Sequence, residues 1–187
     1  MTLSGGQVVR VEDLKRGMAV QTLKGPNKVA AVLRTTISSG RAYICHIGDL
    51  KITPWHPIVS PDQWVLPADA VSPELVGCDA VYSVLLLPDG DPDAHSMSIS
   101  DVWCVTLGHG LTSAGTRDDV RSHSFLGHYE RVLRELSCLE GFHDEDEVMR
   151  CAGTRRNPDD GRICGFIGEY LARDGYSVEE VRGSVCV

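Results

Sequence analysis

The chain has 187 residues, of which 42% are hydrophobic, and its formal net charge at pH 7 is −8. This length is enough for one domain, or for one domain with an appended subdomain, and the hydrophobic share supports a buried core. The acidic balance and the lack of any basic run exclude general nucleic-acid binding, because no cluster of cations exists to bind phosphates. No apolar stretch of about 18 residues predicts a membrane span. The first residues also lack the charged and then apolar pattern of a secretory signal.

The seven cysteines indicate free thiols rather than a disulfide framework. Their number is odd, the gaps between them are irregular, and no two of them form a CxxC pair. A disulfide-stabilised domain has an even number of cysteines in a smaller chain, and a zinc ribbon has tightly spaced pairs. We therefore expect a cytoplasmic protein that carries no cofactor and no metal.

The first part of the chain, residues 1–112, has the pattern of a mostly β domain. Turn signals recur about every dozen residues, and hardly any segment has the 3.6-residue periodicity of a helix. Runs of β-branched and alternating residues mark the expected strands. These strands are residues 7–12, 18–22, 28–37, 42–47, 64–67, 80–87, 97–99 and 102–107.

The remainder, residues 113–187, is expected to be an extension packed on the β domain. Apolar residues at helical spacing predict one helix over about 122–139, with the hydroxyl of Ser122 or Ser124 as its cap. Residues 140–161 are polar and acidic, with the acidic run 144–147, and predict a solvated loop with short extended segments near its end. The apolar segment 163–171 fits either a strand or a helix.

The segment 52–57, with the sequence ITPWHP, holds a hydroxyl and an imidazole three residues apart, on Thr53 and His56. Its two prolines cannot donate an N–H group and bias the residues before them away from helix. A stiff platform with these two side chains suits a site that polarises a carbonyl and protonates a leaving nitrogen. The alternative is a proline-bounded loop between strands, with Thr53 bonded to the backbone and His56 packed on Trp55, because short motifs often mislead.

Four pieces of the chain, taken in order, resemble the Hint superfamily, which contains hedgehog autoprocessing domains and inteins. They are the segment 6–22, the Thr-x-x-His block at 53–56, the segment 81–85 and the segment 95–104. Two further segments, 105–110 and 122–129, are most similar to the Vint branch, whose Hint domains are often found behind von Willebrand A domains. The resemblance covers residues 5 to about 135. It implies a Hint-like horseshoe of short strands and hairpins with a C-terminal, helix-containing extension.

The resemblance implies chemistry on the protein's own backbone. In the family, an N-terminal cysteine attacks the carbonyl before it and forms a thioester, and a second nucleophile (water, a sterol or another side chain) then takes the acyl group. Carried over by position, Thr53 would orient the scissile peptide and His56 would be the general acid. Cys104, with Asp101 nearby, would serve the downstream step, and His109 is a further candidate for the same pocket. These residue types suit the implied acyl-transfer chemistry, since imidazole titrates near neutrality and a thiolate is both nucleophile and leaving group. The alternative for Cys104 is the role of a buried small hydrophobic residue.

The sequence departs from the family pattern at both ends of the reaction. The family's leading cysteine would lie about a strand ahead of Gly6, where Thr2 and Ser4 are the only hydroxyls and have too little chain before them. Ser83 stands where inteins often have an acid. The segment 108–110 lacks the asparagine that ends a splicing intein. We therefore expect no full protein splicing and no self-cleavage by the chain as it stands.

Two functions follow from the resemblance. The first is a Hint/Vint-type autoprocessing domain that acts in cis on its flanking polypeptide, which makes it self-cleaving rather than a turnover enzyme. The second is a catalytically dead Hint-like module that serves as an interaction or structural domain beside a von Willebrand A domain. A metal site is a further alternative, but its spacings are not diagnostic and packing or capping roles are simpler. Its candidate ligands are His109, His123, His128 and either Cys138 or Cys151.

Overall fold

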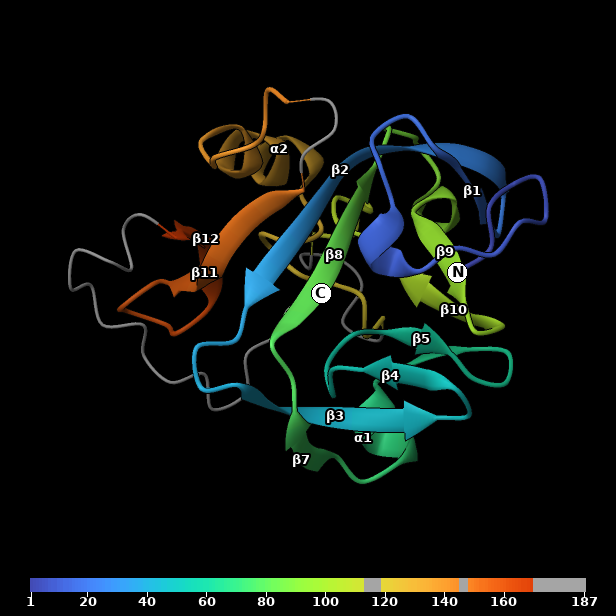
Figure 1. Cartoon of the computed structure of the whole chain (residues 1–187), viewed down its shortest axis with the longest axis horizontal. Helices are drawn as coiled ribbons and strands as arrows, with labels where there is room; N and C mark the ends of the chain where they lie inside the picture. The colour runs from blue at the N-terminus through green and yellow to red at the C-terminus, as the bar shows by residue number, and fades with distance from the viewer. Residues whose placement is uncertain (113–118, 145–147, 170–187) are drawn as a thin grey trace.

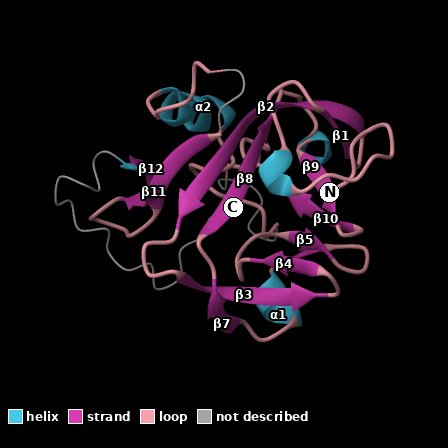
Figure 2. Cartoon of the chain, viewed as in Figure 1, coloured by secondary structure: helices cyan, strands magenta, loops and turns pink. Residues whose placement is uncertain are grey.

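The computed structural model describes residues 1–112, 119–144 and 148–169, and within them short strands predominate (Figures 1 and 2). This confirms the mostly β, Hint-like fold class. The strands are β1 (Ala19–Thr22), β2 (Gly25–Thr36), β3 (Arg41–Ile47), β4 (Leu50–Ile52), β5 (Ile58–Val59), β6 (Trp64–Val65), β7 (Glu74–Gly77), β8 (Ala80–Leu86), β9 (Ser96–Ile99), β10 (Val102–Val105), β11 (Met149–Arg156) and β12 (Ile163–Gly168). The helical elements are η1 (Val11–Asp13), α1 (Pro67–Ala70), η2 (Pro92–Ala94) and α2 (Tyr129–Ser137). None of the helices in these ranges has the length and apolar composition needed to cross a bilayer.

The strands form three sheets. The largest has the order β1-β2-β11-β12, with β8 also paired to β2, and the other two have the orders β6-β5-β10-β9 and β4-β3-β7. Figure 1 shows β2 between β8 and β11 at the centre of the molecule. Successive side chains of a strand point to opposite faces of its sheet. Along β2, Val32 and Leu33 accordingly belong to two different hydrophobic clusters, so this strand separates the two main parts of the core.

The strand β11 overturns the prediction of a solvated loop over 140–161. It pairs in parallel with β2, where Met149 lies opposite Leu33, and antiparallel with β12. Its alternation is hard to see in the sequence because the buried face carries only Met149 and Cys151 before a glycine, among exposed arginines. The segment 163–171 is resolved as the strand β12 as far as Gly168. Residues 145–147 of the acidic run lie outside the described ranges.

The helix α2 begins at Tyr129, seven residues later than the sequence predicted, so neither of the two serines caps it. The preceding turn is held by His123, whose Nδ1 accepts hydrogen bonds from Phe125 N at 3.1 Å and Leu126 N at 3.0 Å. These backbone groups would otherwise belong to the first turn of a helix. Helical spacing of apolar residues therefore extends into a segment whose backbone is satisfied by a side chain.

Residues on both sides of position 112 share the largest sheet and one core. The cluster around Leu33, Leu85 and Leu107 also contains side chains from α2, β11 and β12, among them Leu136 and Phe166. The later segment thus contributes the parallel neighbour of β2 as well as a cover for the sheet.

Candidate functional site

The loop that contains Thr53 and His56 is a tight turn between β4 and β5. The His56 N–H donates to the carbonyl of Thr53 over 3.3 Å, which closes the turn. Both side chains are buried, with 9% and 6% of their surface exposed, whereas Trp55 between them is 41% exposed. The turn therefore directs the hydroxyl and the imidazole inward and the indole outward.

His56 is oriented by the last residue of β10. Its Nε2 lies 2.9 Å from the carbonyl oxygen of Val105, and Val105 N donates to the carbonyl of Pro57 at 3.1 Å. A carbonyl oxygen only accepts hydrogen bonds, so Nε2 carries the hydrogen and Nδ1 is the nitrogen whose lone pair can exchange a proton. The structure thus places the His56 imidazole against the end of β10, in the same turn as Thr53.

Cys104 lies one residue before Val105, but its thiol is enclosed by apolar side chains. It is directly opposite Ile58 of β5 and Met97 of β9. Burial raises the pKa of the Cys104 thiol to about 12. A protonated thiol is a poor nucleophile, so in this conformation Cys104 has the environment of a small core residue.

Asp101 sits at the opposite end of the same hairpin. Ser100 and Asp101 both have positive φ, 49° and 63°, which is the type I′ geometry of a two-residue hairpin turn. The four-residue step from Asp101 to Val105 corresponds to roughly 13 Å of strand. The structure therefore does not bring Asp101 together with His56, and turn geometry accounts for its position.

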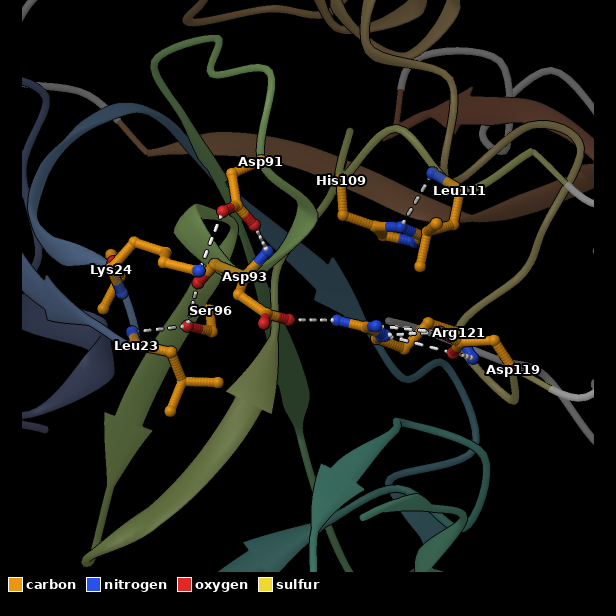
Figure 3. A network of polar contacts seen from close by, with 10 residues as sticks. Leu23, Lys24, Asp91, Asp93, Ser96, His109, Leu111, Asp119 and Arg121 are labelled. Carbon is orange, nitrogen blue, oxygen red and sulfur yellow. Dashed lines mark hydrogen bonds and ion pairs between the residues drawn. The ribbon is translucent and has the colours of Figure 1, made fainter. Parts of the chain in front are cut away.

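His109 is buried and neutral. Burial, followed by the nearby guanidinium of Arg121, lowers the pKa of His109 to about 3. Its Nδ1 accepts a hydrogen bond from Leu111 N at 3.3 Å, which Figure 3 shows. At neutral pH this neutral imidazole accepts a hydrogen bond from its own loop. A neutral imidazole is a poor proton donor, so His109 is not suited to act as a general acid.

Sequence reasoning missed His95, which lies just before β9, and Thr106, which lies just after β10. His95 Nδ1 and Thr106 Oγ1 are the two buried side-chain atoms, within the described ranges, that have no hydrogen-bond partner. Thr106 N donates to the carbonyl of His95 at 2.9 Å, which continues the β9–β10 ladder by one residue past Val105. No spacing in the sequence marks this pair, because only the cross-strand register places the two residues side by side.

A network of charges holds the loops around this end of the hairpin (Figure 3). Arg121 bonds to Asp93 at 2.7 Å and to Asp119 at 2.8 Å, and its guanidinium lies 4.5 Å from the ring centroid of Trp64. Ser96 Oγ donates to the carbonyl of Asp93 at 2.7 Å. The network therefore ties β6, the 91–96 segment and the 119–121 segment together.

No three histidine, cysteine or carboxylate side chains of the described residues meet in the way that a metal site requires. Among the candidate ligands, His109 and His123 each use Nδ1 to accept a backbone N–H. Cys151 is buried and lies 3.2 Å from the hydroxyl of Thr35. These contacts correspond to the packing and capping roles that were the simpler alternative.

Comparison with protein families finds a match to the Vint model, described as a Hint domain, over residues 1–165. The chain is a member of the Vint family of Hint domains. The match confirms the resemblance found in the sequence and extends it past residue 135. A comparison with curated proteins finds no match.

The matched range of this Vint domain runs from Met1 into β12. It includes the Thr53–His56 turn, the β9–β10 hairpin and the helix α2. The family unit therefore spans both sides of position 112.

Proposed function

We propose that this Vint domain is an autoprocessing domain, which cleaves its own flanking polypeptide through an N–S acyl shift and a thioester. The observation that carries the proposal is the buried turn that holds Thr53 beside His56, with the imidazole oriented by the Val105 carbonyl. A hydroxyl donor and a proton carrier are the two groups needed to handle a scissile peptide bond.

The first residues of the chain run beside β1 and β9. Thr2 N donates to the carbonyl of Ser98 at 3.1 Å, and Leu3 forms an antiparallel bridge with Val20. Because the bridge is antiparallel, a step back from Leu3 to Met1 follows β1 toward its C-terminal end.

That end of β1 adjoins the start of β9. Leu23 N, just after β1, donates to Ser96 Oγ at 3.0 Å, and Ser96 is the register partner of Val105. A polypeptide joined to the amino group of Met1 would therefore continue toward the part of the hairpin where His56 is bound. This direction supports the upstream flank as the substrate in cis.

The chemistry follows from these positions and from the family's use of a leading cysteine. The thiol sulfur of a cysteine on the upstream flank attacks the carbonyl before it, so a C–S bond forms and the C–N bond breaks. His56 Nδ1 takes the thiol proton and delivers it to the departing nitrogen, while the Thr53 hydroxyl donates to the carbonyl oxygen. Cys104, Asp101 and His109 have structural roles in this proposal: core packing, the hairpin turn and the loop anchor.

Two features of context belong to the proposal. The six free cysteines of the described residues fit a reducing, cytoplasmic location. The similarity to Vint domains suggests a von Willebrand A domain as a neighbour in the chain. The second function, a catalytically inactive module beside such a domain, is the alternative that the experiment separates.

The test is a fusion that places a reporter and a cysteine-containing segment ahead of Met1. We expect addition of a small thiol to release the reporter, because the thiol captures the thioester. His56→Gln is expected to slow release by roughly 10²–10⁴-fold, and Thr53→Val by roughly 10²–10³-fold. Gel separation and mass spectrometry of the released fragment give the rates.

His46→Gln is the matched control, because His46 lies exposed on β3. This substitution is expected to leave the release rate unchanged. Thiol release that persists in His56→Gln at the rate of the unmodified fusion contradicts the proposed role of His56. A fusion that releases nothing favours the inactive module instead.

A further inference from the structure

Building on the proposed function, we propose that Thr106 accepts the acyl group from the thioester, with His95 as its general base. The thioester of the first step needs a second nucleophile, and the structure offers one on the residue that follows Val105. The acyl acceptor would then be a side chain of the domain itself rather than water or an external molecule.

The first support is the unsatisfied state of both side chains. His95 and Thr106 are each 1% exposed, yet His95 Nδ1 and Thr106 Oγ1 have no hydrogen-bond partner. Buried polar atoms are almost always paired, and leaving one unpaired costs about 1–3 kcal/mol. Two such atoms on laterally paired residues indicate a position that is completed by a bound group.

The second support is the way His95 is held. Its Nε2 lies 3.2 Å from both the carbonyl oxygen and the N–H nitrogen of Asp89, and its ring meets the edge of Tyr129. In the tautomer in which Nε2 donates to that carbonyl, Nδ1 carries the lone pair, as a base requires. Burial also lowers the pKa of His95, so the ring is neutral and able to accept a proton at neutral pH.

The third support is the position of Thr106 relative to the first step. Thr106 is two residues from Cys104, so both side chains lie on the same face of the hairpin. Cys104 is directly opposite Met97, and Met97 belongs to the same hydrophobic cluster as Met1. The hydroxyl therefore lies on the face of the hairpin that carries Met97, which packs in one cluster with Met1.

The transfer balances without any further reactant. Thr106 Oγ attacks the thioester carbonyl, the new C–O bond forms and the C–S bond breaks. The hydroxyl proton moves to His95 Nδ1, and His95 then donates it to the departing thiolate. The products are an oxygen ester on Thr106 and a free thiol on the flank.

The experiment uses the reporter fusion without added thiol. We expect the reporter to move from the peptide backbone onto the peptide that contains Thr106, as an adduct that resists hydroxylamine at neutral pH and is lost under alkaline conditions. Thr106→Val is expected to lose the adduct and to accumulate thioester, which added thiol then releases. Thr106→Ser is expected to restore the adduct, and His95→Gln to slow its formation by roughly 10²–10⁴-fold.

The outcomes separate this inference from the proposed function. An adduct that persists in Thr106→Val, or thiol release with no adduct in the unmodified fusion, overturns Thr106 as the acceptor and leaves the autoprocessing function standing. An unmodified fusion that forms no thioester overturns both. Because Val has the shape of Thr and the Thr106 hydroxyl has no partner to lose, loss of folding is not an expected outcome of Thr106→Val.

Discussion

Buried hydroxyl groups in this Vint domain differ in whether the fold supplies their partners. Thr22 Oγ1 donates to the carbonyl of Gly25 at 2.7 Å and accepts from Lys24 N at 3.1 Å. Thr106 Oγ1 has no partner, although the two side chains are almost equally buried. At the residue scale, the first hydroxyl stabilises a hairpin turn, whereas the second is available for a bound group.

This difference predicts opposite effects of the same substitution. Thr22→Val is expected to lower the free energy of unfolding by about 1 kcal/mol, because it removes the two hydrogen bonds that the buried hydroxyl makes with Lys24 N and the Gly25 carbonyl. Thr106→Val is expected to leave it unchanged or raise it by up to about 1 kcal/mol, since an unpaired hydroxyl is removed. Urea unfolding of the two variants measures both values. Equal losses at the two positions would show that Thr106 has a partner in solution.

At the scale of elements, the sequence predicts those strands whose apolar pattern is intact. The strands β2 and β8 are long and rich in β-branched or large apolar residues, and both lie close to their predicted bounds. The strand β11 was missed because two flanking strands, rather than its own composition, hold it in place. The start of α2 was misplaced because His123 satisfies the backbone of the preceding turn.

The candidate site was predictable only where its residues are close in sequence. The spacing of Thr53 and His56 identified their turn, since proline restricts the backbone locally. The register that pairs His95 with Thr106 depends on the β9–β10 hairpin, and no local pattern shows it. The family resemblance assigned Asp101 and Cys104 to the downstream step and left a buried core role for Cys104 open, whereas the structure shows Asp101 at the hairpin turn and Cys104 in the core.

The ion pairs of Arg121 hold the loops around the β9–β10 hairpin together. They therefore predict how the free energy of unfolding changes with pH. Hydrogen bonds from Arg121 hold the pKa of Asp119 below its ordinary value of 3.8. A lowered pKa means that the carboxylate stabilises the fold above that ordinary value, and that the contribution disappears as the pH falls through the lower, folded value. Asp119→Asn is expected to lower the free energy of unfolding by about 1–2 kcal/mol at neutral pH.

The same difference should shrink when the pH falls below about 3.8, where the unfolded carboxyl becomes protonated. Thermal or urea unfolding of Asp119→Asn and of the unmodified domain, at a series of acid pH values, measures this difference in the free energy of unfolding. Asp62→Asn is the control, because Asp62 is exposed on the β5–β6 turn and is expected to leave stability unchanged. A difference that stays constant down to the most acid pH would contradict the role of the Arg121 pair.

At the scale of the whole molecule, the segment after residue 112 is part of the core that supports the site. Its described residues supply nine buried side chains to the cluster around Leu33: Phe125, Leu126, Val132, Leu136, Leu139, Met149, Cys151, Ile163 and Phe166. Burial of a large apolar side chain contributes roughly 1.5–3 kcal/mol, and the net stability of a domain is only about 5–15 kcal/mol. We therefore expect residues 1–112 alone to lack enough of the core to be stable.

A chain that ends at residue 112 is accordingly expected not to fold cooperatively. Its circular dichroism melt should lack a sharp transition, and it should bind a hydrophobic dye through the exposed faces of β2 and β8. A chain that ends at Glu169 is the control, since it retains β11 and β12. A cooperative melt of the shorter chain would show instead that residues 1–112 are an independent domain.

The parallel pairing of β11 with β2 has a consequence for timing during synthesis. Residues 149–151 pair with the edge of β2, a strand whose synthesis ends at Thr36. A ribosome needs on the order of ten seconds to make the chain between Thr36 and Met149. During this interval one edge of β2 is open, and His95 lacks the ring of Tyr129 against which it rests. For the proposed self-cleavage, we expect the upstream flank to stay attached until α2 and β11 have been translated and most of the chain exists.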